Sequence, residues 1–247
     1  MNLPEIIQLE TTESTNDDVV NLARNGAPHM SCVCADFQTK GRGRRGNSWE
    51  APAGANLLFS ILLRLDCDPI RWHRVPQIAG MELIHTVESA FSPCNDITMK
   101  WPNDLYYCDM KWSGVLAESK FENEPFVVLG IGMNCFGDGS NYPELVRNQV
   151  TTLEQIFDVS GFDRFELLKS FLTRLAGSID LFLNDFVPVV EFCRRRDHLF
   201  DRKISVEVEG RERRGTGVGI SPEGHLMIRE LNGDLLTIQS GSVNEII

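Results

Sequence analysis

The sequence is most distinctive at Lys40-Gly41-Arg42-Gly43-Arg44-Arg45-Gly46-Asn47-Ser48-Trp49, where four of the ten residues are cationic and three are glycine. The chain as a whole is acidic, with a formal net charge of -11. Arginine side chains fork onto phosphate or carboxylate oxygens, and glycines let the backbone approach an anion closely. We therefore expect this stretch, the Gly-rich loop (residues 40–49), to hold an anionic ligand.

The spacing Gly41-x-Gly43-x-x-Gly46 also matches the dinucleotide-binding fingerprint, which requires a helix directly after its last glycine. The residues that follow include Pro52 and Gly54 and have no helical periodicity, so a Rossmann site is disfavoured. A Walker pattern is missing from the sequence. The acidic charge and the lack of interleaved aromatic residues count against an RNA-binding loop.

The composition limits the classes of protein to consider. A chain of 247 residues suffices for one sizeable domain or for a large and a small one. A sequence pI of about 4.9 argues against unspecific binding to nucleic acid or to an anionic membrane. No apolar run reaches the length of a transmembrane helix, of about 18 residues. Seven cysteines without a Cys-x-x-Cys pair indicate reduced thiols in the cytoplasm, and the five histidines form no metal-ligand pattern.

Apolar periodicity predicts an alternation of helices and strands up to about residue 199. Helices are expected over 17–24, 72–91, 163–186 and from Pro188 to about 198, and strands over 31–37, 56–65, 97–101, 105–107, 112–119 and 126–132. The polar segment 136–147 is expected to be a mobile loop. From residue 200 the pattern changes to short strands at 204–208, 215–220, 226–230 and 235–238, separated by strong turn signals. We expect residues 1–199 to form the main domain and residues 200–247 a small all-β module.

A second constellation narrows the function. It consists of Lys100-Trp101-Pro102-Asn103-Asp104, a six-residue gap, Lys111, and then Gly114-Val115-Leu116-Ala117-Glu118. Together with the Gly-rich loop, it resembles biotin protein ligases, the enzymes that attach biotin to a lysine of a biotin carboxyl-carrier protein. The resemblance covers nearly all of the chain and extends to Ser14-Thr15-Asn16, Gln38, Gly130-Ile131-Gly132-Met133-Asn134 and Ser240-Gly241.

The resemblance implies an α+β fold. It consists of a mixed, mostly antiparallel sheet with flanking helices, as in class II aminoacyl-tRNA synthetase-related ligases, followed by a small C-terminal SH3-like β-barrel. It also implies that ATP and Mg²⁺ activate biotin as biotinoyl-5′-AMP with release of pyrophosphate, and that the carrier lysine then attacks the adenylate. Because biotin and ATP are both anionic, charge neutralisation and alignment should supply most of the catalysis.

The same resemblance assigns the biotin end of the site. A ureido ring carries two N–H donors and one carbonyl acceptor, which hydroxyl and amide side chains complement. Ser14, Thr15, Asn16 and Gln38 match the contacts to this ring. Gly41 and Arg42 would contact biotin or line its pocket, and Gly114, Val115 and Leu116 would form the pocket wall.

The nucleotide end is assigned in the same way. The set implied to bind ATP or the adenylate is Arg42, Arg44, Arg45, Trp49, Asn103, Asp104, Lys111 and Asn134. Within it, Lys111 bridges the biotin carboxylate and the α-phosphate, and Arg44 retains the adenylate. Asp104 would hold Mg²⁺ or orient the phosphates, and Asn134 would contact the phosphate or the metal. Trp49 would help the loop to close over the ligand and exclude water.

The chain departs from the family pattern in two places. Asn47 stands where a basic residue often follows the Gly-rich motif, and Trp112 stands where a smaller aliphatic residue is usual. Trp101 is expected to belong to the core. Many bacterial family members begin with a DNA-binding winged helix, for which this sequence has no room. We therefore expect a cytoplasmic ligase that binds neither nucleic acid nor membrane.

Two alternatives share some of these features. Lipoate–protein ligases and octanoyl transferases have the same fold, but their Arg-Arg…Gly-Gly-Gly stretch is missing from this sequence. A biotin-sensing or nucleic-acid-binding module without enzymatic activity would need a DNA-binding part or a basic face. Relatives form homodimers through a sheet edge, which a single sequence does not reveal.

Overall fold

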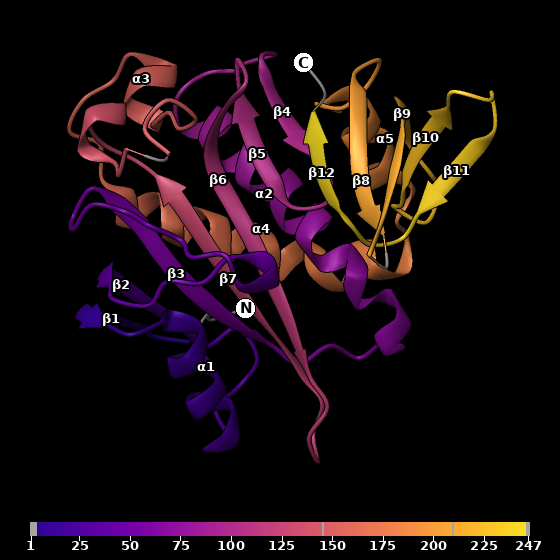
Figure 1. Ribbon diagram of the computed structural model, residues 1–247. Helices are drawn as coiled ribbons and strands as arrows, with labels where there is room; N and C mark the ends of the chain where they lie inside the picture. The colour runs from indigo at the N-terminus through magenta and orange to yellow at the C-terminus, as the bar shows by residue number, and fades with distance from the viewer. Residues whose placement is uncertain (1–3, 145, 209, 246–247) are drawn as a thin grey trace.

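The computed structural model describes residues 4–144, 146–208 and 210–245 (Figure 1). Two β-sheets and five α-helices make up this part of the chain, which confirms the expected α+β class with a mixed sheet and flanking helices. Among the described residues, no helix combines the length and the apolar character that a membrane crossing requires.

The larger sheet has seven strands in the order β1-β2-β3-β7-β6-β5-β4. Its strands are β1 (Ile6–Thr12), β2 (Cys32–Gln38), β3 (Asn56–Leu63), β4 (Ile97–Lys100), β5 (Asp104–Tyr107), β6 (Met110–Lys120) and β7 (Phe126–Asn134). Only the β1–β2 pair is parallel, and the other neighbours run antiparallel. The central strands β3 and β7 are buried along their whole length, as their apolar sequences predict.

The two faces of this sheet are covered differently, and the difference follows from side-chain alternation. On β7, Leu129, Ile131 and Met133 point into the main core, which α2 (Val75–Ala90) and α4 (Arg164–Asn184) complete behind the sheet (Figure 1). The alternate residues of β7 face the other side. There α1 (Thr15–Arg24) packs Val19, Val20 and Ala23 against Val33, Leu62, Phe126 and Val128. α1 contacts β2, β3 and β7 on this face of the sheet.

The second sheet has five antiparallel strands in the order β11-β10-β9-β8-β12. They are β8 (Lys203–Val208), β9 (Arg211–Ile220), β10 (Leu226–Glu230), β11 (Leu235–Ile238) and β12 (Ser242–Glu245). Its inner residues Ile204, Val206, Ile220, Leu226 and Ile228 belong to the same core as the main domain. Helix α5 (Val187–Arg195) leads into this sheet and has Pro188 in its first turn, where a proline costs no hydrogen bond.

Most of the predicted elements are confirmed, and the differences are short or peripheral. The structure adds β1, β12, α3 (Leu153–Phe157) and three 3₁₀ turns, η1 (Arg44–Gly46), η2 (Pro69–Arg74) and η3 (Gly139–Asn141). The segment 136–147, expected to be a mobile loop, contains η3 and the buried Tyr142, whose hydroxyl donates to Asn56 at 2.8 Å. Trp112 and Trp101 are both buried, so each is a core residue.

The edge strand β4 is hydrogen-bonded to the segment between α5 and β8, which leads into the second sheet. The Met99 N–H donates to Arg196 O at 2.7 Å, and the His198 N–H donates to Met99 O at 3.0 Å. Between them, Asp197 accepts the Leu199 N–H through Oδ1, while its Oδ2 is buried without a hydrogen-bond partner among the described residues. Burial raises the pKa of the Asp197 carboxyl to about 6 from its ordinary value of 3.8.

We predict that Asp197 makes the protein less stable as the pH rises from 4 to 7. Because its pKa is higher in the folded than in the unfolded chain, folding favours the protonated acid and loses that advantage as the pH passes through 6. The free energy of unfolding of Asp197→Asn minus that of the wild type should rise by about 2–3 kcal/mol over this range, measured by urea denaturation.

Asp185→Asn is the matched control for the loss of a carboxylate that accepts a backbone N–H two residues ahead. Asp197 accepts the Leu199 N–H in this way, and the exposed Asp185 accepts that of Val187. A difference between Asp197→Asn and the wild type that does not change with pH would contradict the assignment of this buried carboxyl.

Candidate functional site

A cavity of about 610 Å³ lies on the face of the large sheet that α1 leaves uncovered. Its walls come from α1, from β6 and β7, from the Gly-rich loop and from β12 of the second sheet. Among the described residues, the cationic side chains that line it are Arg42, Arg44, Lys100 and Lys111, and the acidic one is Asp104. In a chain with a net charge of -11, this local excess of positive charge supports an anionic ligand.

The floor of the cavity is made of glycine. Gly114 on β6 and Gly132 on β7 are paired across the two strands. A β-carbon on Gly132 would lie 2.3 Å from Trp49 Cε2, and one on Gly114 would lie 2.9 Å from Trp49 Cζ3. The indole of Trp49, the last residue of the Gly-rich loop, therefore rests directly on the sheet backbone. Any larger residue at position 132 would displace it.

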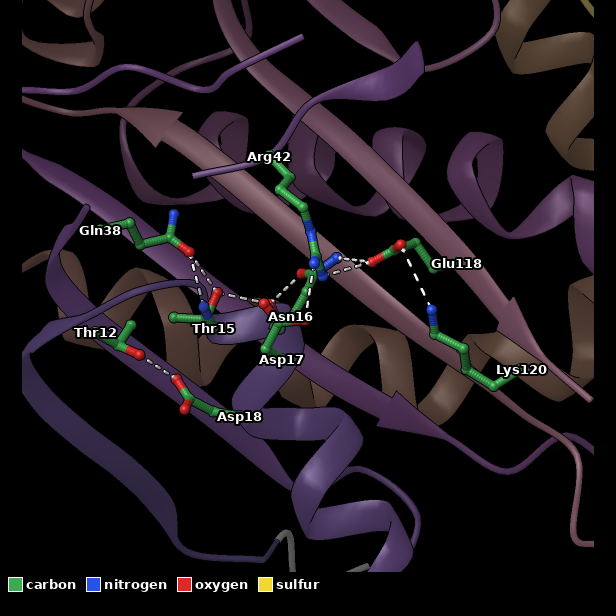
Figure 2. A network of polar contacts seen from close by, with 10 residues as sticks. Thr12, Thr15, Asn16, Asp17, Asp18, Gln38, Arg42, Glu118 and Lys120 are labelled. Carbon is green, nitrogen blue, oxygen red and sulfur yellow. Dashed lines mark hydrogen bonds and ion pairs between the residues drawn. The ribbon is translucent and has the colours of Figure 1, made fainter. Parts of the chain in front are cut away.

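Polar groups gather at the end of the cavity next to α1. Gln38 Oε1 accepts the Thr15 backbone N–H at 2.8 Å and lies 3.1 Å from the Thr15 hydroxyl. The Thr15 hydroxyl also lies 2.7 Å from the hydroxyl of the buried Ser60. Figure 2 shows the Gln38 amide nitrogen pointing away from Thr15. Both hydroxyls and the amide are held in place by other protein groups, so this end of the site is built before a ligand arrives.

Asn16 is buried beside Thr15 on α1. Its amide oxygen accepts from Ser60, and its amide nitrogen donates to Glu118 Oε2 at 2.7 Å. A β-carbon on Gly130 would lie 2.1 Å from Asn16 Oδ1, so only glycine at position 130 leaves room for this side chain. Asn16 lines the cavity, but both ends of its amide are engaged by protein groups. Its contacts support Thr15 and Ser60.

The opposite end of the cavity holds a charged pair. Lys111 Nζ lies 2.7 Å from Asp104 Oδ1, and each side chain is about three-quarters buried. The ammonium also lies 5.2 Å from the centre of the Trp49 ring, a cation–π distance. On β5 and β6, Asp104 pairs with Gly114 and Tyr106 pairs with Lys111, with a register shift between Leu105 and Tyr106. Because Asp104 and Tyr106 lie on the same face of β5, this shift places Lys111 on that face beside Asp104.

Arg44 approaches the same carboxylate from the loop. Its guanidinium donates to Asn103 Oδ1 at 3.3 Å, and Asn103 in turn donates to Val115 O at 2.7 Å. The pKa of Arg44 is lowered, mainly by burial. The charge of Asp104 opposes this shift and that of Arg45 adds to it. A guanidinium keeps its charge in proteins, so a second cation lies near the Asp104 carboxylate that pairs with Lys111.

The Gly-rich loop is folded over the cavity. Arg42 and Ser48 form an antiparallel bridge, and the 3₁₀ turn between them places Arg45 at φ +56° and Gly46 at φ +81°. The three arginines reach three different parts of the molecule. Arg42 pairs with Asp17 and Glu118, Arg44 with Asn103, and Arg45 with β8, where its guanidinium donates to Glu207 O at 3.4 Å.

The cavity brings together most of the residues predicted from the sequence. The predicted residues that line it are Ser14, Thr15, Asn16, Gln38, Arg42, Arg44, Trp49, Asn103, Asp104, Lys111, Gly114, Val115 and Leu116. Gly41 and Arg45 line instead a second hollow of about 580 Å³ on the outer side of the loop. Asn134 lines neither hollow. It is buried beneath Lys111 and donates to Lys111 O at 3.3 Å, so in this structure it supports the lysine backbone.

Sequence reasoning did not assign several lining residues. Lys100 and Tyr106 line the cavity, with Lys100 Nζ 5.1 Å from the centre of the Tyr106 ring. Lys100 opens the second motif and could have been assigned from that position. Val146 lies within the polar segment 136–147, and Gln149 and Val150 follow it. The Lys111 N–H donates to Gln149 O at 2.7 Å. Ser242, Val243 and Asn244 come from β12, which no local pattern connects with the site.

Comparison with known proteins gives a consistent result. The model of the biotin/lipoate A/B protein ligase family matches residues 8–134. A biotin–[acetyl-CoA-carboxylase] ligase of Mycobacterium tuberculosis is 30% identical over 94% of this chain and 85% of its own length. The bifunctional ligase/repressor BirA of Salmonella typhimurium is 28% identical over 90% of this chain and 68% of its own length.

A solved structure shows the same fold. The biotin protein ligase from Aquifex aeolicus in complex with biotin and ATP superposes with a TM-score of 0.83 at 26% identity, over 99% of this chain and 100% of that chain. The family model matches about half of the chain, and the mycobacterial relative is similar over nearly all of it. This chain therefore belongs to the biotin/lipoate A/B protein ligase family.

Proposed function

We propose that this protein is an ATP-dependent biotin protein ligase. It activates the biotin carboxylate as biotinoyl-5′-AMP with release of pyrophosphate, and it transfers the biotinoyl group to a lysine of a biotin carboxyl-carrier protein. One observation carries the proposal. A single cavity has a neutral polar end at Gln38 and Thr15 and a cationic end at Lys111 and Arg44. This polarity matches a ligand with an uncharged ureido ring and a carboxylate that reacts with a phosphate.

The neutral end would bind the ureido ring. Ser14, Thr15 and Gln38 offer hydroxyl and amide groups, the chemistry that two N–H donors and one carbonyl require. Asn16 acts from beneath, because its own amide is occupied by Ser60 and Glu118. The pocket wall would be the strand Gly114, Val115 and Leu116, and Arg42 would border the pocket from the loop, with Gly41 next to it in the second hollow.

The cationic end would align the two anions. In the ligand-free arrangement, Lys111 is neutralised by Asp104 at 2.7 Å. A bound biotin carboxylate and α-phosphate would take the place of this partner, and the ammonium would then draw the carboxylate oxygen towards the phosphorus. Arg44, anchored through Asn103, would stay on the adenylate after pyrophosphate leaves. Asn134 would contribute by fixing the Lys111 backbone.

Mg²⁺ would enter with ATP. The described residues contain no cluster of three or more metal-ligating side chains, so the protein by itself offers no metal cage. A single carboxylate together with phosphate oxygens and waters is a coordination that Mg²⁺ accepts. Asp104 fits this requirement once a phosphate releases it from Lys111. Bound there, the ion would neutralise phosphate charge.

We infer a catalytic domain over residues 1–199, of the class II synthetase-related type, and an SH3-like barrel over residues 200–247, because a separate five-stranded sheet begins at β8. A homodimer would use an edge of the large sheet, where β1 and β4 are the outer strands. Seven free cysteines suit a cytoplasmic protein.

The alternative is a lipoate or octanoate ligase of the same family. The polar end of the cavity favours biotin, because a dithiolane or an alkyl chain has no group to satisfy Gln38 and Thr15. The mycobacterial relative is named as a biotin ligase, and the Aquifex aeolicus structure contains biotin and ATP. Pyrophosphate exchange that depends on lipoate and ignores biotin would establish the alternative.

We predict that Lys111→Ala reduces biotin-dependent ATP–pyrophosphate exchange by about 100-fold or more, because a preorganised charge at the reacting phosphate is lost. Lys169→Ala is the matched control. Lys169 also lies 2.7 Å from a carboxylate, that of Glu166, but on the exposed side of α4. Equal exchange rates in the two variants would exclude Lys111 from the reaction, and no exchange with any acid in the wild type would refute the ligase function.

We further predict that Gly132→Ala opens the site. The new methyl group would lie 2.3 Å from Trp49 Cε2, so the indole must leave the floor and the loop must shift with it. We expect kcat/KM for biotin to fall about 10- to 100-fold and AMP to be released without a carrier protein. Gly177→Ala on α4, where a β-carbon meets nothing within 4 Å, is the matched control and should keep wild-type activity. Wild-type kcat/KM in Gly132→Ala would contradict the role given to Trp49.

A further inference from the structure

Arg42 differs from the other cations of the cavity because two acidic side chains hold it. Its Nη1 lies 2.8 Å from Asp17 Oδ1, and its Nη2 lies 3.1 Å from Glu118 Oε2. Asp17 belongs to the first turn of α1 and Glu118 to β6, so the guanidinium connects the Gly-rich loop with both elements (Figure 2). Because both carboxylates neutralise its guanidinium, Arg42 is not expected to attract a phosphate.

We call the ion pairs of Arg42 with Asp17 and Glu118 the clasp. Glu118 belongs both to the clasp and to the buried hydrogen-bond network of Asn16 and Ser60. Its Oε2 accepts from Arg42 and also from the Asn16 amide at 2.7 Å, and Asn16 accepts from the buried Ser60 (Figure 2). Glu118 faces this side of the sheet because it pairs with Val128, which packs under α1. Its side chain is 26% exposed, against 53% for Asp17, so the Glu118 ion pair is the less screened of the two.

We propose that Glu118, together with Asp17, is a positioning residue that keeps the Gly-rich loop folded over the cavity by holding Arg42. Without these carboxylates, Arg42 would lose the ion pairs that tie the loop to α1 and β6, and the glycines of the loop would allow it to open. The clasp therefore lets the loop close before an anionic ligand is present. The position of the loop can be tested without the proposed function, whereas the catalytic consequence rests on that function.

Limited trypsin digestion reports the loop directly, because Arg44 and Arg45 are cleavage sites within it. Cleavage of a folded loop follows the population of its open form. We expect Glu118→Gln to be cut in the loop about two- to five-fold faster than the wild type. The double variant Asp17→Asn/Glu118→Gln and the single variant Arg42→Gln should be cut faster still. Added NaCl should accelerate cleavage of the wild type and narrow its difference from Glu118→Gln.

Glu122→Gln is the matched control. Glu122 lies on the same side of the molecule and pairs with an arginine of α1, Arg24, at 2.7 Å, but it does not touch the loop. It should be cleaved at the wild-type rate. Glu118→Gln retains an oxygen to accept the Asn16 amide, so the fold should survive, and thermal denaturation of each variant checks this. Equal loop cleavage in Glu118→Gln, Glu122→Gln and the wild type would overturn the proposal.

Kinetics separate positioning from chemistry. Glu118→Gln should raise KM for biotin about two- to five-fold in pyrophosphate exchange and leave kcat unchanged, since the reacting end at Lys111 is intact. A fall in kcat at an unchanged KM would overturn the positioning role. If no acid supports exchange in the wild type, the ligase function fails, and the digestion result still decides whether Glu118 holds the loop.

Discussion

The site depends on the contact between the Trp49 indole and the bare backbone of Gly132 and Gly114. On β7, large residues at 129, 131 and 133 fill the core, while the alternate positions 130 and 132 are glycine. One strand therefore builds a packed core on one face and a flat trough on the other. The trough admits Asn16 at Gly130 and Trp49 at Gly132, and the loop that carries Trp49 can then lie close enough to roof the cavity. Side chains on these glycines would fill the space for both.

The charges above this floor are arranged so that a ligand replaces protein partners instead of meeting bare cations. Lys111 pairs with Asp104, Arg44 lies within the field of the same carboxylate, and Arg42 has two carboxylates of its own. Unpaired cations in an empty site would repel one another, whereas cations that are all paired would bind anions weakly. Pairing Lys111 with Asp104 therefore stabilises the empty cavity, while the nearby Arg44 keeps this end of the cavity attractive to an anion.

The sequence was sufficient for those parts of the site that lie within a motif. Lys111, Asp104 and Gly114 are close in sequence and meet through one hairpin, and the structure brings them together as predicted. The family resemblance assigns Asn134 to the phosphate or the metal, whereas in this structure its side chain donates to Lys111 O, a contact that no motif encodes. Ser242, Val243 and Asn244 lie about 130 residues beyond Lys111 and reach the cavity only through the packing of the second sheet, which no local period encodes. Strand β1 was missed because its exposed pattern is polar and its parallel partner lies beyond α1.

The three arginines of the Gly-rich loop explain how one short segment can serve both binding and closure. Arg44 points into the cavity, Arg42 points back to α1 and β6, and Arg45 reaches β8 of the second sheet. The backbone achieves this divergence within four residues by a left-handed turn at Arg45 and Gly46. Because the two outer arginines are tied to different parts of the protein, moving the loop breaks contacts on both sides at once. The inner arginine is thereby held at the cationic end of the cavity by ion pairs that its two neighbours make with α1, β6 and β8.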